Sequence, residues 1–144
     1  MKKLPVILIL VFFLTGIVIS GCSSNTASRN FRLAPADNLP EEVLGAPKTV
    51  QQSYQFAIEN PQILKEIPCY CGCGSMGHTS NYACYIKDDN SSDDLVFDGH
   101  ALGCSICVDI TQDTMDMLDQ GMSLSEIQVE IDSIYSAFGP SNKP

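Results

Sequence analysis

Basic residues are scarce in this chain. It has eight Lys and Arg residues against 17 Asp and Glu residues, and its formal net charge at pH 7 is −9. A chain this acidic is repelled by phosphate backbones, so no nucleic-acid partner is expected. Acidity also favours solubility and can raise the local concentration of cations, but it does not specify a fold.

The motifs of common hydrolases are absent as well. No arrangement of Ser, His and Asp stands out as a catalytic triad, and no metalloprotease helix motif occurs. The polar turn at residues 88–94 is rich in Asp, but it lacks the glycine and the terminal Glu of an EF-hand loop, so a solvated turn is expected there. We therefore expect a protein that is not an enzyme, with thiol redox activity as the alternative that stays open.

A long apolar run occurs only near the N-terminus. Met1-Lys2-Lys3 forms a short basic region, and the run from Val6 to Ile19 follows it. The run is short for a membrane-spanning helix, which needs about 20 residues, and it fits the apolar core of a secretory signal. Ile19-Ser20-Gly21-Cys22 resembles the lipobox of bacterial lipoproteins. This resemblance implies cleavage before Cys22, diacylglycerol on its sulfur, and anchoring to the bacterial cell membrane outside the cytoplasm; a plain signal peptide or an uncleaved anchor is the alternative.

Composition divides the chain into four segments. Residues 1–21 are the signal, and because this segment carries Lys2 and Lys3 but no acid, its removal changes the net charge from −9 to −11. Residues 22–43 hold the lipidated Cys and a flexible tether. Residues 44–139 form one small Cys-rich domain, whose modest core would benefit from metal or disulfide staples. Residues 140–144 are a short tail.

The apolar spacing predicts a mainly α fold, a small helical domain with an irregular Cys-rich loop and one short β-hairpin. Two short helices are expected between Thr49 and Ile67, separated at Asn60-Pro61, where Asn suits the N-cap and Pro the first helical position. The hairpin is expected between residues 82–86 and 95–98.

Two longer helices are expected in the C-terminal half. The first runs from Gly103 to Gln120, and the second begins at Ser123 with a capping box to Glu126. The apolar face of the last helix is formed by Leu124, Ile127, Ile131, Ile134 and Phe138.

Six of the seven cysteines and both histidines fall within one 39-residue stretch. Thiolates and imidazoles are the preferred ligands of soft and borderline metals, so this stretch is the main functional signal. The eight donors would fill two tetrahedral zinc sites, and Cu(I) is equally satisfied by sulfur, so the expected ion is Cu(I) or Zn(II). Met76 could add a thioether. The predicted ligands are Cys69, Cys71, Cys73, His78, Cys84, His100, Cys104 and Cys107.

The spacing within the stretch suits a metal site. In an extended Cys69-x-Cys71-x-Cys73 segment the side chains point the same way, and the intervening glycine lets the sulfurs converge. Cys104 and Cys107 are expected in the first turn of a helix, where the helix dipole lowers the thiol pKa. No His follows Cys107 directly, so covalent c-type haem is not indicated.

Two alternatives to metal binding stay open. The first is a disulfide-stapled module that binds another envelope protein, because six is an even number and the expected compartment is oxidising. The second is thiol–disulfide exchange, with Cys104 as the attacking thiol and Cys107 as the resolving one.

Pro68-Cys69-Tyr70-Cys71-Gly72-Cys73, with Gly77-His78 and Cys84 downstream, resembles the bacterial lipoproteins named for a PCYCGC motif. The resemblance extends over residues 49–138. It implies a secreted or anchored protein with the cysteines at its centre, and it identifies no metal. The sequence therefore favours a lipid-anchored metal-binding protein, with the metal as a structural site or as cargo exchanged with a metal-donor or metal-acceptor protein of the envelope.

Overall fold

The computed structural model describes residues 30–88 and 95–143. The predicted signal, Cys22, and most of the polar turn at residues 88–94 lie outside the described residues. The fold is mainly α, as the sequence predicts. Its elements are α2 (Glu41–Leu44), α3 (Lys48–Glu59), α4 (Pro61–Leu64), α5 (Ser105–Asp119) and α6 (Leu124–Tyr135), the strands β1 (Ile86–Asp88) and β2 (Val96–Phe97), and the 3-10 turns η1 (Ala36–Asn38), η2 (Cys73–Met76), η3 (Tyr82–Cys84) and η4 (His100–Leu102).

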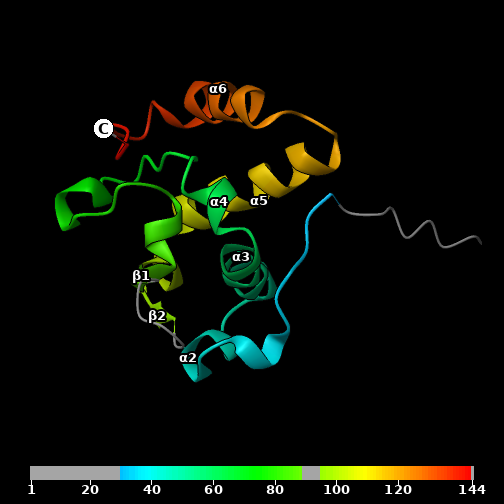
Figure 1. Ribbon diagram of the computed structural model, residues 1–144. Coiled ribbons are helices and arrows are strands. Elements are labelled where there is room, and N and C mark those ends of the chain that lie inside the picture. Colours follow the sequence, from blue (N-terminus) through cyan, green and yellow to red (C-terminus); the bar gives the residue numbers. More distant parts are fainter. Residues whose placement is uncertain (1–29, 89–94, 144) are drawn as a thin grey trace, which may run out of the picture.

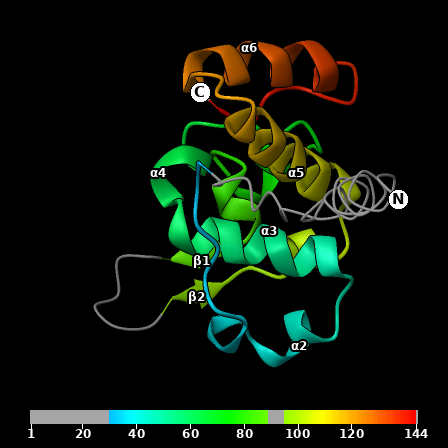
Figure 2. The same cartoon turned by 90° about the vertical axis from the view of Figure 1, so that its right-hand side faces the viewer.

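The longer helices are stacked, with α6 on α5 and α5 on α3, while α2 lies at the opposite end (Figure 1, Figure 2). α3 supplies the centre of the core, since Tyr54 and Phe56 on it are fully buried. The Tyr54 ring packs edge-to-face on Tyr85, with 4.9 Å between ring centroids. Burying one such side chain stabilises the fold by about 1.5–3 kcal/mol. The core thus joins α3 to the segment that carries Cys84.

The predicted break at Asn60-Pro61 is confirmed, and Pro61 begins α4. The predicted side-chain cap is wrong, because the Asn60 amide does not cap α4 and instead donates to the carbonyls of Arg32 (2.8 Å) and Phe56 (2.9 Å). Asn60 is buried beneath the incoming N-terminal segment. Its amide therefore ties the N-terminal segment to the end of α3.

Residues 30–43, which the sequence assigns to the tether, pack on α3 in the structure. The Phe31 ring meets Phe56 edge-to-face at 5.0 Å, and the Gln55 side chain donates to the Ala34 carbonyl at 2.7 Å. The large apolar residues of this segment, Phe31, Leu33, Leu39 and Val43, are separated by small, polar and proline residues. They show no helical or strand period, so the sequence pattern does not reveal the packing.

The hairpin is present but shorter than predicted. Ile86 pairs with Phe97 and Asp88 with Val96 in an antiparallel ladder. Residues 82–84 form η3 rather than strand. This turn brings Cys84 inward, where it is fully buried.

The last helix has the predicted capping box. Glu126 accepts a hydrogen bond from the Ser123 backbone at 2.8 Å, and the Ser123 hydroxyl accepts one from the Glu126 backbone. The predicted apolar face is partly wrong, because Ile134 and Phe138 are 42% and 63% exposed. Tyr135 is buried instead: α6 ends there, so Phe138 no longer follows helical spacing.

No helix within residues 30–88 and 95–143 is both long enough and apolar enough to cross a bilayer.

Candidate metal centre

The segment with the densest cysteines is an irregular loop between α4 and η2. Gly72 within it has φ +83°, a left-handed conformation that side chains with a Cβ rarely adopt. Cys69 and Cys73 are buried, whereas Cys71 is partly exposed. The predicted irregular loop is thus observed, and it presents one thiol at the surface and two inside.

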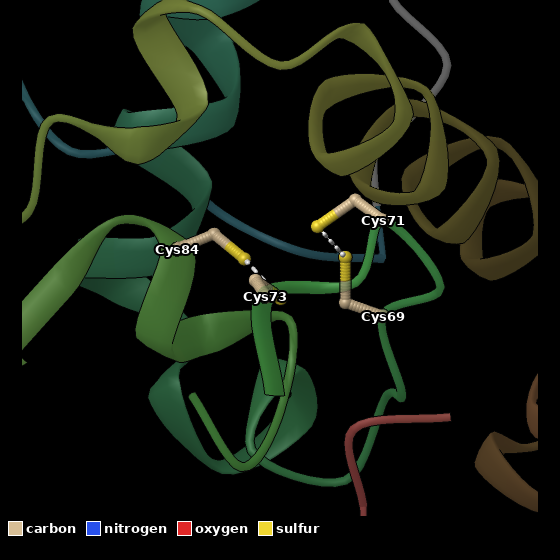
Figure 3. Close-up of side chains that lie close together, drawn as sticks. All are labelled: Cys69, Cys71, Cys73 and Cys84. Atoms are coloured by element: carbon tan, nitrogen blue, oxygen red, sulfur yellow. Dashed lines mark hydrogen bonds between the residues drawn. The ribbon is translucent and has the colours of Figure 1, made fainter. Parts of the chain in front are cut away.

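Three sulfur atoms form a triangle at the centre of the cluster. The Sγ atoms of Cys69 and Cys71 are 3.4 Å apart, as Figure 3 shows. Cys107 Sγ lies 3.6 Å from Cys69 Sγ and 3.5 Å from Cys71 Sγ. Cys107 comes from the first turn of α5, so the triangle joins that helix to the loop.

Further donors lie on either side of the triangle. Cys73 Sγ and Cys84 Sγ are 3.8 Å apart and point toward one another (Figure 3). On the other side, His100 Nε2 is 3.5 Å from Cys71 Sγ.

Two sets of four donors result, each with all its ligand atoms within 4.8 Å of one another. The first set is Cys69, Cys71, Cys73 and Cys84, and the second is Cys71, His100, Cys104 and Cys107. The structure thus brings together seven of the eight predicted ligands, from four separate parts of the chain.

All six cysteines of the two sets are free thiols. Their sulfur atoms are 3.4–3.8 Å apart in the closest pairs, compared with about 2.05 Å for a disulfide bond. Such spacing suits sulfurs that share an ion.

Crowding sets the protonation of these thiols. The pKa of Cys69 is well below its usual value because the thiols of Cys107 and Cys84 donate hydrogen bonds to its sulfur. The same hydrogen bond to Cys69, together with burial, raises the pKa of Cys107. The expectation that the helix dipole lowers the pKa of Cys107 is therefore wrong, because the neighbouring sulfurs and burial outweigh the dipole. Burial likewise raises the pKa of Cys71. A cation at the centre would supply the charge that lets these thiols ionise together.

Of the two histidines, His100 belongs to a donor set and His78 does not. Asp98 Oδ1 accepts a hydrogen bond from the His100 backbone at 2.7 Å, which positions His100 at the end of β2. His78 Nε2 lies 3.5 Å from Asp98 Oδ2, and the two imidazole rings meet edge-to-face at 5.2 Å. His78 belongs to neither set of four, and its buried Nδ1 has no hydrogen-bond partner within the described residues. Met76 is 57% exposed, and no contact of its sulfur with the cluster is observed among the described residues.

Residues 139–143, here called the C-terminal clasp, hold the cysteine loop in place. Asn142 Oδ1 accepts from the Cys69 backbone at 2.7 Å, and Asn142 Nδ2 donates to the Ser80 carbonyl at 3.1 Å and toward Cys73 Sγ at 3.5 Å. Gly139 lies so close to the loop that an added Cβ would be 2.7 Å from the Tyr70 carbonyl oxygen.

Sequence reasoning missed Asn142 and Asp98 as residues that support the cluster. Asp98 could have been found, because an Asp two residues before a candidate ligand commonly accepts that residue's backbone N–H. Nothing in the sequence marks Asn142, which acts across 73 residues of chain.

A cavity of about 330 Å³ adjoins the second set of donors. It lies between the start of α3 and the start of α5, and Cys104, Val50 and Asp109 are among its lining residues. Cys71, His100 and Cys104 are all partly exposed. This side of the cluster is therefore accessible from solvent, whereas the side with Cys73 and Cys84 is buried.

Fold and site together define a small α-helical protein built around a cysteine–histidine cluster with metal-ligand spacing. The chain belongs to the family described as "Protein of unknown function with PCYCGC motif", whose family model matches residues 11–142. No curated protein and no solved structure matches the chain.

Proposed function

We propose that this protein binds a soft or borderline metal ion, Cu(I) or Zn(II), at the outer face of a bacterial cell membrane, where a lipid on Cys22 anchors it. The observation that carries the proposal is the convergence of six thiols and one imidazole from separate chain segments. Thiolate-rich sites select Zn(II) and Cu(I) over harder ions.

We favour a carrier or buffer over a purely structural ion. Cys71, His100 and Cys104 are partly exposed, and Cys104 borders the 330 Å³ cavity. An accessible ligand can be replaced by a ligand from another protein, as exchange with a metal donor or acceptor requires. The buried ligands would also tie the loop to α5, so that bound metal adds to the stability of the fold.

Thiol–disulfide exchange is the weaker alternative. Its support is Cys104, which is partly exposed beside a cavity. Two observations count against it. The raised pKa of Cys107 disfavours the thiolate form of the resolving thiol. The six thiols are also gathered in one group rather than set apart as a single redox pair.

The test is metal analysis of the full-length chain, purified in detergent without chelator. We expect a stoichiometric amount of Zn or Cu, and protection of the six domain thiols from iodoacetamide until a chelator removes the metal. A metal-free chain with a mass six hydrogens lower than that of the reduced form would mean three disulfides and would contradict the proposal.

The rate at which bound metal leaves the folded protein distinguishes a carrier from a structural metal site. A chromogenic chelator should remove metal from the folded protein faster than the protein unfolds. If metal is lost only when the protein unfolds, the ion is structural and the protein is not a carrier.

A further inference from the structure

The two sets of four donors have one atom in common, Cys71 Sγ. We propose that the cluster binds two metal ions and that the Cys71 thiolate bridges them. The inner ion is held by Cys69, Cys71, Cys73 and Cys84, and the outer ion by Cys71, His100, Cys104 and Cys107. This inference rests on the proposed metal-binding function and specifies the number of ions and the ligands of each.

The number of donors fits two ions. Two tetrahedral ions form four metal–ligand bonds each. The two sets contain seven different residues, and a bridging thiolate forms two bonds, so every donor is used and both shells are complete. A single ion would leave at least three of these donors without a metal.

The distances agree with this arrangement. With metal–sulfur bonds of about 2.3 Å, two sulfurs of one tetrahedral site lie about 3.8 Å apart, and a sulfur and an imidazole nitrogen about 3.6 Å apart. Cys73 Sγ and Cys84 Sγ are 3.8 Å apart, and Cys71 Sγ and His100 Nε2 are 3.5 Å apart. In the central triangle, the Cys69–Cys71 pair (3.4 Å) shares the inner ion and the Cys71–Cys107 pair (3.5 Å) shares the outer ion, and each pair needs to separate by only a few tenths of an ångström.

Charge favours divalent ions. Six thiolates with two Cu(I) ions leave a residual charge of about −4, whereas two Zn(II) ions leave about −2. In a chain with a net charge of −9, the smaller residual charge costs less. When Zn(II) binds, each thiol that is still protonated releases its proton to solvent, every sulfur ligand forms a sulfur–metal bond, and no electron is transferred.

The two ions occupy different environments. Three inner ligands, Cys69, Cys73 and Cys84, are buried, whereas Cys71, His100 and Cys104 on the outer side are partly exposed. The outer ion is therefore the one that exchanges with a partner protein, and the inner ion exchanges more slowly.

The bridge can be tested on the wild-type chain. The full-length protein, reduced and stripped of metal in detergent, is loaded with ¹¹³Cd(II). We expect two ions per chain by native mass spectrometry and two ¹¹³Cd resonances, one from four sulfurs and one from three sulfurs and a nitrogen. Cd–Cd coupling through the shared sulfur is the signature of the bridge. Two resonances without Cd–Cd coupling would contradict a bridging Cys71 sulfur.

Matched variants test the ligand sets. Cys73→Ser should weaken only the inner ion, and Cys104→Ser only the outer one, each leaving one tightly bound ion. Met76→Leu is the control, since Met76 lies in the same region but in neither set, and it should keep two ions. Binding of one ion by the wild type, or of three or more Cu(I) ions, would overturn the two-ion assignment but would still support metal binding. Binding of no metal at all would overturn both the two-ion assignment and the proposed function.

Discussion

Single polar residues that hydrogen-bond to the cysteine loop hold the sulfur atoms in position and so affect metal affinity. Asn142 contacts the loop at Cys69, Cys73 and Ser80, so it fixes both the backbone and one sulfur. Such supporting partners typically change metal affinity by about 10–100-fold when they are removed.

Asn142→Ala should therefore lower Zn(II) affinity by about tenfold or more while leaving the number of ions unchanged. Competition with a chromogenic chelator measures this change. Lys143→Ala is the matched control: its side chain pairs with Glu66 at 2.8 Å, away from the sulfurs, and its removal should leave the affinity unchanged. Equal affinities of the two variants would contradict a supporting role for Asn142.

His78 is the predicted ligand that lies outside both sets of donors. Its Nε2 lies near Asp98, and its buried Nδ1 has no partner within the described residues. An unsatisfied buried nitrogen of this kind costs about 1–3 kcal/mol.

We expect His78→Gln to keep two metal ions, whereas His100→Gln should retain one tightly bound ion. Native mass spectrometry of the two variants, loaded side by side, gives the comparison. Loss of one ion from the His78 variant would place this residue among the ligands, as the sequence alone suggests.

At the scale of elements, the C-terminal clasp packs closely against the cysteine loop. An added Cβ at Gly139 would meet the Tyr70 carbonyl oxygen at 2.7 Å, and this oxygen belongs to the backbone of the cysteine loop. Neither the loop nor the clasp can move without disturbing the contacts of Asn142.

Gly139→Ala should destabilise the protein by about 1–3 kcal/mol, as overpacking does elsewhere. Denaturant unfolding followed by circular dichroism measures this. Gly45→Ala is the control, because no atom lies within 4 Å of its added Cβ and its φ of −81° is ordinary. A loss of stability in the control equal to that in the Gly139 variant would show that the close approach to Tyr70 is not the cause.

Elements that depend on local signals could be predicted: the capping box of Ser123 and Glu126, and the break at Pro61. The gathering of the cysteines could be predicted from composition. The eight donors also suggested two sites, but which donor belongs to which set could not be predicted, because this depends on how α5 brings Cys107 to the loop, a contact across 38 residues. The burial of Phe31 is a long-range contact of the same kind.

At the scale of the molecule, the core and the cluster are one unit. Tyr54 donates to the Asp98 carbonyl at 2.7 Å, and Tyr85 donates to the Cys107 carbonyl at 2.8 Å. The two phenols therefore connect the packed centre of the fold to the residues beside His100 and to the first turn of α5. Ionisation of these phenols would disturb both the core and the cluster.

This connection predicts how stability changes in alkali. Burial, followed by the nearby charge of Asp98, raises the pKa of Tyr54 above its usual value of 10.0, and burial does the same for Tyr85. Because the folded-state pKa values are raised, the stabilisation is complete below pH 10 and is lost as the pH rises above it. The unfolded chain then releases protons that the folded chain retains, and each such group lowers the free energy of unfolding by about 1.4 kcal/mol per pH unit.

Denaturant unfolding of the zinc-loaded protein from pH 8 to pH 11 measures this slope. Thiols bound to metal are already ionised, so they contribute little to it. Tyr54→Phe removes one phenol with a raised pKa and should make the slope shallower, even though it also costs the hydrogen bond to Asp98 and lowers stability at pH 8. All other titrating groups are the same in both proteins, so the difference between the two slopes isolates the phenol. Identical slopes would mean that Tyr54 ionises in the folded state as readily as in the unfolded chain, and that the core beside the cluster admits a charge.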